Sequence, residues 1–177
     1  MTIVVRLGVS DEQIAALFAT FPKLLLKSSP GKGLGVFADS DIPAGEYVTA
    51  YPAHSIWRVL RTCDDSRQEL ERISGNSTPD DAKTYGLCVG EYCCVGDPQR
   101  VSPKVLGHMI NDAARSHRPQ DEELYSMISE TRENVRPEVF AGKDVKPRTV
   151  IMKTTQDIKS GEELFFSYGT PYWRFKW

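Results

Sequence analysis

The stretch GEELFFSYGTPYW, residues 161–173, lies near the end of a 177-residue chain and is strongly aromatic. A short span beside a glycine turn holds Phe165, Phe166, Tyr168, Tyr172 and Trp173. Side chains of this kind gain free energy when they leave water. We therefore expect the end of the chain either to pack against the core or to line a site. Other motifs in the sequence are needed to choose between these two roles.

Composition favours one globular domain with an ordinary core, since 40% of the residues are hydrophobic and the formal net charge is −2. The 22 basic residues are scattered among 24 acidic ones, which argues against direct nucleic-acid binding. Neither a membrane-length apolar run nor a signal peptide is visible, so the sequence predicts a nuclear or cytoplasmic protein without membrane association.

The cysteines include an adjacent pair but no paired C-x-x-C spacing, and they are Cys63, Cys88, Cys93 and Cys94. This pattern favours reduced, partly buried thiols with a structural role over a zinc site. The sequence therefore predicts no metal.

Short β-branched and aromatic runs separated by Gly and Pro predict a mainly β fold with short helices and small, irregular sheets. The chain opens with an expected strand at 2–7 and a helix at 10–22, capped by Ser10 with Gln13. Further expected elements are a helix at 64–74, a loop at 75–83, strands within 85–97, a helical stretch at 103–112, a loop or helix at 115–134, and strands near 136–142 and 148–158.

The glycine-rich segment GKGLGVFA, residues 31–38, satisfies a loose dinucleotide-binding pattern. That pattern requires a helix N-terminus to follow the glycines, whereas Pro43 and Gly45 indicate a turn. Taken alone, the glycines are better interpreted as a tight β-turn.

Three stretches occur in a fixed order: SPGKGLGVFADSDIPAGEYVTAYP at 29–52, GHMINDA at 107–113, and DIKSGEELFFSYGTPYW at 157–173. Together they resemble the SET-domain protein lysine methyltransferases, most closely the small viral-type SET proteins without zinc-binding flanking modules. The resemblance spans residues 23–177 and leaves 1–22 as a strand–helix extension. It implies the SET fold, in which small curled β-sheets meet at a C-terminal knot-like crossing, and a possible homodimer.

The resemblance also implies an activity, the transfer of methyl groups from S-adenosyl-L-methionine to a lysine of a protein substrate, with histone tails as the leading class. Lys32, Gly33 and Leu34 of the glycine turn would contact the methionine part of the cofactor. Asn111 and Asp112 would lie on the adenine side, and Asp112 stands where the family usually has histidine. His108, one residue after Gly107, is expected to be a packed histidine.

Tyr168 matches the family's central catalytic tyrosine, placed where the lysine channel meets the methyl donor. Tyr51 and Tyr85 match aromatic residues of the channel, although each could equally be an ordinary half-buried sheet tyrosine. Phe166 matches a position that sets how many methyl groups fit beside the lysine nitrogen. Tyr172 and Trp173 would pack over the cofactor and channel, or form a hydrophobic tail on the core.

Two departures from the family leave alternatives open. Residues 113–132 form an insertion, interpreted as a solvated helix or as a cover over the substrate groove. The Asp112 replacement admits a catalytically impaired SET fold that binds a peptide or the cofactor without turnover. An unrelated β-rich interaction protein is a further alternative, for which the order of the three motifs would be a coincidence.

Overall fold

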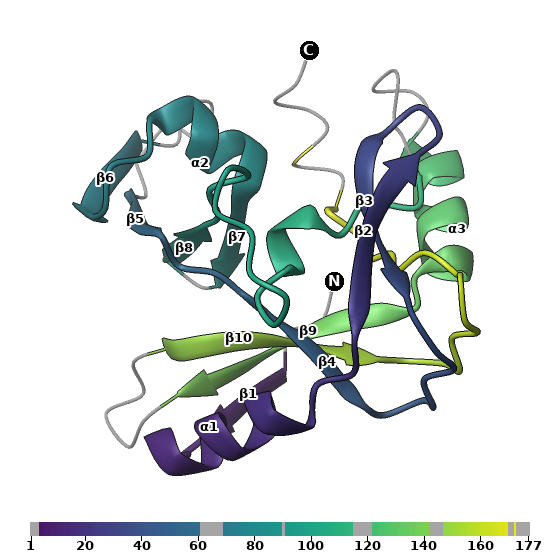
Figure 1. Cartoon of the computed structure of the whole chain (residues 1–177). Coiled ribbons are helices and arrows are strands. Elements are labelled where there is room, and N and C mark those ends of the chain that lie inside the picture. Colours follow the sequence, from purple (N-terminus) through teal and green to yellow (C-terminus); the bar gives the residue numbers. More distant parts are fainter. Residues whose placement is uncertain are drawn as a thin grey trace.

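The computed structural model describes residues 4–60, 69–89, 91–114, 122–141, 147–169 and 172. Within them the strands form three sheets, and the helices are short (Figure 1). The mainly β architecture predicted from the sequence is confirmed.

The largest hydrophobic cluster lies where strands of two sheets, the end of the chain and Leu87 of a third sheet meet. The first sheet has the order β1 (Val4–Leu7), β9 (Val135–Ala141), β10 (Pro147–Thr154) and β4 (Tyr47–Tyr51). The second is a hairpin of β2 (Leu24–Ser29) and β3 (Gly33–Ala38). Fully buried side chains from both sheets and from the terminal segment pack together, among them Val36, Val48, Val150 and Leu164. The aromatic end of the chain is therefore part of the main core.

The third sheet has the order β6 (Glu69–Ser74), β5 (Ser55–Leu60), β8 (Tyr92–Val95) and β7 (Gly86–Val89). In Figure 1 this sheet and the β2–β3 hairpin lie on opposite sides of the segment that carries the 3₁₀ turn η1 (Gly107–Met109). The η1 segment therefore lies between the third sheet and the β2–β3 hairpin.

The first strand belongs to the same sheet as the domain's central strands. β1 pairs in parallel with β9, and Arg6 donates to the Glu138 carboxylate at 2.6 Å. Tyr47 also donates to this carboxylate, at 2.8 Å. Side chains of α1 (Asp11–Thr20), among them Ile14 and Phe18, pack against the cluster that includes Phe140 of the same sheet. The boundary that separates residues 1–22 from the SET domain stays a prediction.

The helices differ from the sequence expectations in three places. α1 (Asp11–Thr20) has the predicted capping box between Ser10 and Gln13. The helix expected at 64–74 is wrong over 69–74, which form β6, because pairing with β5 outweighs local helix propensity. Its remaining residues, 64–68, lie outside the described residues. The helical stretch at 103–112 shrinks to η1.

The loop expected at 75–83 is also wrong in its second half, which is the helix α2 (Pro79–Tyr85). Thr78 caps this helix through the Asp81 amide, and Pro79 occupies the first turn. Both signals are present in the sequence, since a capping residue followed by Pro favours a helix start. The helix α3 (Glu122–Arg132) lies within the stretch predicted as a loop or helix.

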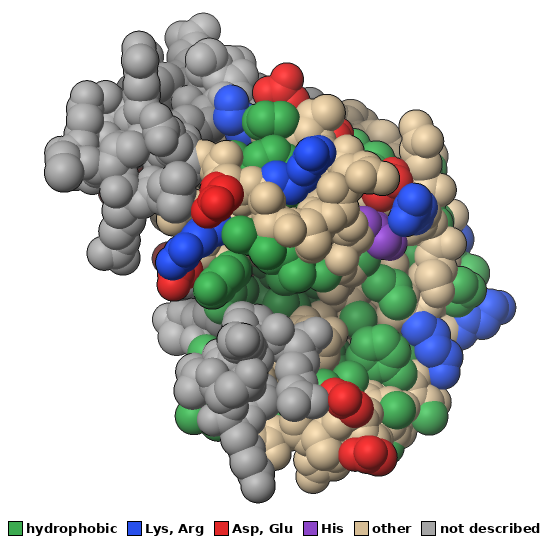
Figure 2. Space-filling view, turned by 90° about the vertical axis from the view of Figure 1, so that its left-hand side faces the viewer, with side chains coloured by type: hydrophobic (Ala, Val, Ile, Leu, Met, Phe, Trp, Pro, Cys, Tyr) green, Lys and Arg blue, Asp and Glu red, His purple; other side chains and the backbone are tan. Residues whose placement is uncertain are grey.

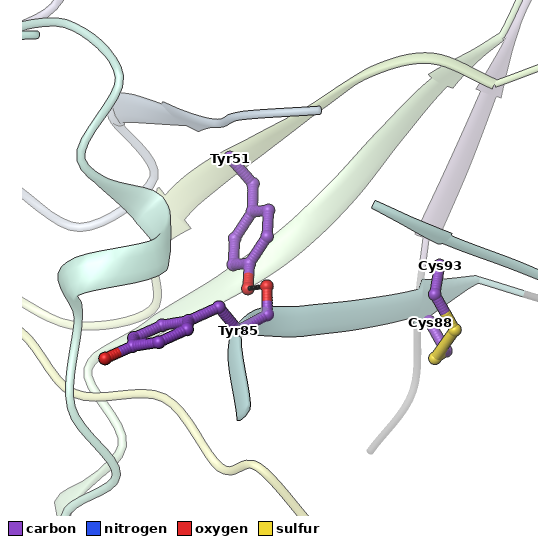
Figure 3. The surroundings of a disulfide bond; sticks show 4 residues. All are labelled: Tyr51, Tyr85, Cys88 and Cys93. Atoms are coloured by element: carbon purple, nitrogen blue, oxygen red, sulfur yellow. Dashed lines mark hydrogen bonds between the residues drawn. A yellow bond between two sulfur atoms is a disulfide. The ribbon is translucent and has the colours of Figure 1, made fainter. Parts of the chain in front are cut away.

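The expectation of reduced thiols is wrong for two cysteines. Cys88 and Cys93 lie directly opposite each other in the β7–β8 hairpin and form a disulfide (Figure 3). The spacing along the chain does not reveal this pairing, because it depends on the register of the hairpin. Cys94 is a free, half-buried thiol whose pKa is raised by burial. Cys63 lies outside the described residues.

The end of the chain crosses between two other segments. Phe165 bridges Asn111 in parallel, and the Phe166 amide donates to the Asn111 carbonyl at 3.2 Å. On its other side, the Phe165 amide donates to Asn134 Oδ1 at 2.7 Å, while the Asn134 carboxamide donates to the Glu163 carbonyl at 2.9 Å. This crossing fixes the residues just before Tyr168 against the asparagine segment.

Among the described residues, no helix is both long enough and apolar enough to cross a membrane.

Candidate active site

A cavity of about 280 Å³ lies between the terminal segment and the third sheet. Tyr51, Phe166, Tyr168 and Tyr172 line it together with Ile110 and His108. Residues of α2, β7 and β8 complete its wall, including both cysteines of the disulfide. On the face seen in Figure 2, hydrophobic side chains gather in the middle and charged ones surround them. The cavity is suited to an elongated apolar group with a polar end.

Tyr168 is held at its hydroxyl and along its ring. The hydroxyl donates to the Ile110 carbonyl at 2.7 Å, and the ring centroid lies 4.9 Å from Phe166 and 4.6 Å from Tyr172. Burial, followed by the nearby Tyr51 and Tyr172, raises the pKa of Tyr168 well above its usual value. The phenol is therefore neutral at physiological pH and can serve as a hydrogen-bonding group but not as an anionic base.

Tyr51 lies at the end of β4 and is buried, and its hydroxyl donates to the Tyr85 carbonyl at 2.8 Å (Figure 3). Burial raises its pKa far above the usual value, so this phenol is also neutral. Tyr85 is not among the residues that line the cavity, and its side chain packs against the cluster around Trp57 and Cys93. Its phenol is nevertheless one of the neighbours that raise the pKa of Tyr168. The structure therefore joins Tyr51, Phe166 and Tyr168 in one cavity and leaves the Tyr85 ring outside it.

Asn111 joins the glycine turn to the terminal segment. Its carboxamide donates to the Leu34 carbonyl at 3.0 Å and to Glu163 Oε1 at 2.8 Å. A Cβ on Gly35 would overlap the ends of the Glu163 and Asn111 side chains, so glycine at this position leaves room for the arrangement seen. The other Glu163 oxygen accepts from Ser29 at 2.8 Å. Glu163 was not predicted as a site residue, although it stands in the quoted GEEL motif.

Lys32 reaches from the glycine turn across to the segment after Asn111. Its ammonium donates to the carbonyls of Asp112 and Ala113 at 2.6 and 3.1 Å and lies 4.5 Å from the Phe165 ring centroid. Next to it, Gly33 has a left-handed backbone and Leu34 is 53% exposed. Residues 32–34 and 111–112, predicted as one binding region, are therefore close in space and partly open to solvent. Trp173, predicted with them, lies outside the described residues.

His108 is a packed histidine, as expected. It is buried, and its Nε2 lies 3.1 Å from the Asp97 carbonyl. Burial lowers its pKa to about 4. The described parts of the chain contain no group of three His, Cys, Asp or Glu side chains that could hold a metal ion.

The family model of the SET domain matches residues 33–169, more than half of the chain. The search of curated proteins found no match to this chain. Among solved structures, the chain is similar to a humanized mutant of the Chaetomium thermophilum Polycomb Repressive Complex 2, with 18% identity and a TM-score of 0.52 over 89% of this chain. A crystal structure of the Chaetomium thermophilum Polycomb Repressive Complex 2 gives 18% identity and a TM-score of 0.50 over 85% of this chain.

This chain spans 16% of the length of those two chains, and at this identity the likeness concerns the fold alone. A Plasmodium falciparum protein described as a candidate histone methyltransferase shares 19% identity over 86% of this chain and 97% of its own. Its TM-score of 0.45 is too low to support an argument. Because the family model covers more than half of the sequence and the fold agrees, the chain belongs to the SET-domain family of S-adenosylmethionine-dependent protein lysine methyltransferases.

Proposed function

We propose that this enzyme methylates a lysine of a histone tail, with the lysine side chain in the aromatic cavity and Tyr168 at its reacting end. The observation that carries the proposal is the fixed Tyr168 hydroxyl, hydrogen-bonded to Ile110 in a cavity that adjoins the Asn111 crossing. Aromatic and aliphatic walls stabilise the four methylene groups of a lysine and leave its amine to the polar groups at the end. Tyr51 and Phe166 would serve as walls of this channel.

The residues of the glycine turn fit the cofactor by their chemistry. S-adenosylmethionine carries a sulfonium, an ammonium and a carboxylate, and it supplies the methyl group. The carbonyl of Leu34 and the carboxylate of Glu163 offer acceptors for a cation, and the Lys32 ammonium offers a partner for a carboxylate. Because Gly35 has no Cβ, the ends of the Glu163 and Asn111 side chains can lie directly against this part of the glycine segment. Lys32, Gly33, Leu34, Asn111 and Asp112 would hold the cofactor, and Tyr168 would border it.

The cavity residues act by positioning. Both Tyr51 and Tyr168 are neutral phenols, because burial raises their pKa values. The Nε2 atom of His108 lies 3.1 Å from the Asp97 carbonyl, and burial lowers the pKa of this imidazole to about 4, which makes it a weak base. The lysine amine therefore has to lose its proton before transfer, and the protein contributes orientation and exclusion of water.

The substrate and cellular context are proposals that rest on the family resemblance. They comprise a histone tail as substrate, a nuclear or cytoplasmic location, a homodimer without direct nucleic-acid binding, and kinship with the viral-type small SET proteins. The binding-module alternative requires that Asp112 disrupt the site. Against it stands the hydrogen bond from the Tyr168 amide to Asp112 at 2.9 Å, which holds the tyrosine in place.

The test is methyl transfer from labelled S-adenosylmethionine to core histones and to a proteome extract. We expect label on a histone, and a fall of about 100-fold in Tyr168→Phe, equal to about 2.7 kcal/mol of transition-state stabilisation. Tyr47→Phe is the matched control, because it removes a phenol hydroxyl bonded to Glu138 away from the cavity. Its activity should stay within about threefold of wild type.

Label on other proteins but not on histones would reject the histone tail as substrate and leave the proposed methyltransferase activity intact. Full activity in Tyr168→Phe would reject the role of Tyr168. A wild-type chain that binds the cofactor but labels nothing would favour the binding module instead.

A further inference from the structure

The Asp112 carboxylate is a buried acceptor for several donors. Oδ2 accepts the Tyr168 amide at 2.9 Å and the Tyr125 hydroxyl at 2.5 Å. Oδ1 accepts the Ala114 amide at 2.9 Å and lies 3.5 Å from the Ser129 hydroxyl. A carboxylate can accept about four hydrogen bonds, whereas a neutral imidazole accepts at one nitrogen. The family's usual histidine could not take over all of these contacts.

Tyr125 reaches the same point from the inserted helix α3. It is 3% exposed, and besides donating to Asp112 it accepts the Gly169 amide at 2.9 Å. Its hydroxyl also lies 3.2 Å from the Ser167 hydroxyl. Tyr125 and Ser129 are the buried residues of α3 and lie one turn apart, so one face of the helix is turned toward Asp112. The insertion is therefore more than a solvated helix.

These contacts converge on the peptide groups around Tyr168. The Tyr168 amide is bound to Asp112, the following amide of Gly169 to Tyr125, and the Tyr168 hydroxyl to Ile110. The tyrosine is thus fixed at its backbone and at the far end of its ring. Removing one end leaves the phenol free to shift, and a displacement of about 1 Å can lower a rate by about 100-fold.

We propose that Tyr125 and Asp112 form a positioning pair that holds Tyr168 in the orientation required for methyl transfer. The pair rests on the proposed catalytic role of Tyr168. In this chain it takes the place of the usual histidine, with the carboxylate supplied by the asparagine segment and the phenol supplied by the insertion. Burial, with the charge of Asp112 next, raises the pKa of Tyr125 to about 12, so the phenol stays a donor across the working range of pH.

The variants are Tyr125→Phe and Asp112→Asn, with Tyr47→Phe as the control. Tyr47, like Tyr125, donates its hydroxyl to a carboxylate, that of Glu138, but it lies on the strand β4 and does not line the cavity. Each variant is measured for thermal stability, for cofactor binding, for kcat and KM with an unmethylated histone-tail peptide, and for hydrogen exchange of the individual amides by NMR.

We expect Tyr125→Phe to lower kcat by about 10- to 100-fold, with KM and cofactor affinity within about threefold, and Asp112→Asn to lower kcat at least as much. The Tyr168 and Gly169 amides should exchange at least about tenfold faster in Tyr125→Phe than in wild type. Tyr47→Phe should change neither kcat nor the exchange rates of these two amides, even if its melting temperature falls as far as that of Tyr125→Phe. A purely structural role of Tyr125 would instead give equal losses in Tyr125→Phe and Tyr47→Phe, and that result overturns the pair.

Two readouts keep the test decisive. Rapid exchange of the Tyr168 and Gly169 amides in the wild-type protein would overturn the pair without any variant, even if Tyr125→Phe did not fold. If the wild type transfers no methyl group, the proposed function fails, and the amide exchange still decides whether Tyr125 and Asp112 hold Tyr168.

Discussion

Phe166 belongs both to the core and to the wall of the cavity. It can therefore act as a packing residue or influence how many methyl groups the lysine receives. It is 5% exposed, it packs in the main hydrophobic cluster, and its ring lies 4.9 Å from that of Tyr168. The added hydroxyl of a tyrosine would therefore be introduced next to the proposed reacting end of the lysine. We propose that a phenylalanine leaves that space without a polar group, which would allow the amine to turn and to carry further methyl groups.

For Phe166 we predict that the wild type accumulates di- and trimethylated product. Phe166→Tyr should shift the product toward monomethyl, with total turnover within roughly tenfold of wild type, a barrier change of about 1.4 kcal/mol. Mass spectrometry of the methylated peptide measures the distribution. An unchanged mono:di:tri ratio in a folded, active variant would leave Phe166 as a packing residue.

At the scale of elements, the β7–β8 hairpin forms one wall of the cavity and carries the disulfide. Cys88 and Cys93 are cross-strand partners five residues apart, so the bond closes a short loop. The hairpin packs on two hydrophobic clusters, with Val95 beside Trp57 and Ala82, and with Leu87 in the main cluster. The disulfide therefore adds to a hairpin that hydrophobic packing already stabilises.

We predict that reducing the disulfide lowers stability by about 2 kcal/mol, from the chain entropy of a loop of this length. For a chain of this size the melting temperature should fall by roughly 4–8 °C. Melting curves with and without dithiothreitol measure the effect. The double variant Cys88→Ala/Cys93→Ala is the control, and its melting temperature should not respond to the reductant. Four thiols accessible to alkylation in the unreduced, denatured wild type would contradict the disulfide.

At the scale of the whole molecule, acid should weaken the fold through His108. Burial lowers its pKa from the ordinary value of 6.5 to about 4, and the hydrogen bond to Asp97 only partly offsets this. In the unfolded chain the imidazole takes up a proton as the pH falls through about 6.5, whereas the folded protein resists until about pH 4. This contribution to stability is therefore complete above pH 6.5 and decreases as the pH falls toward 4.

We predict a steady loss of unfolding free energy between pH 6.5 and pH 5, approaching about 1.4 kcal/mol for each pH unit. This window lies above the ordinary pKa values of Asp and Glu, so carboxylates contribute little to it. Urea unfolding at pH 7, 6 and 5 measures the loss. The slope should be much smaller in His108→Gln, and an equal slope in both proteins would show that another group is responsible.

Local signals in the sequence were sufficient for the features that depend on neighbouring residues. The Ser10 capping box predicts the start of α1, and the short β-branched runs predict the mainly β class. The order of the glycine turn, the asparagine segment and the GEEL…SYG end determined the family, which the family model confirms. The β6 error shows the limit of such signals, because residues 69–74 become a strand through pairing with β5.

The tertiary structure decided what depends on segments far apart in the chain. The register of a hairpin brings Cys88 to Cys93, and the crossing of the terminal segment brings Glu163 to Asn111. The partner of Asp112 is a tyrosine 13 residues away on a helix whose buried face no local pattern reveals. The sequence by itself determined the chemistry available to this protein, since residue types and their order along the chain are local properties. Only the fold decided which of these groups meet, because a hydrogen bond or a disulfide requires atoms within a few ångströms of each other.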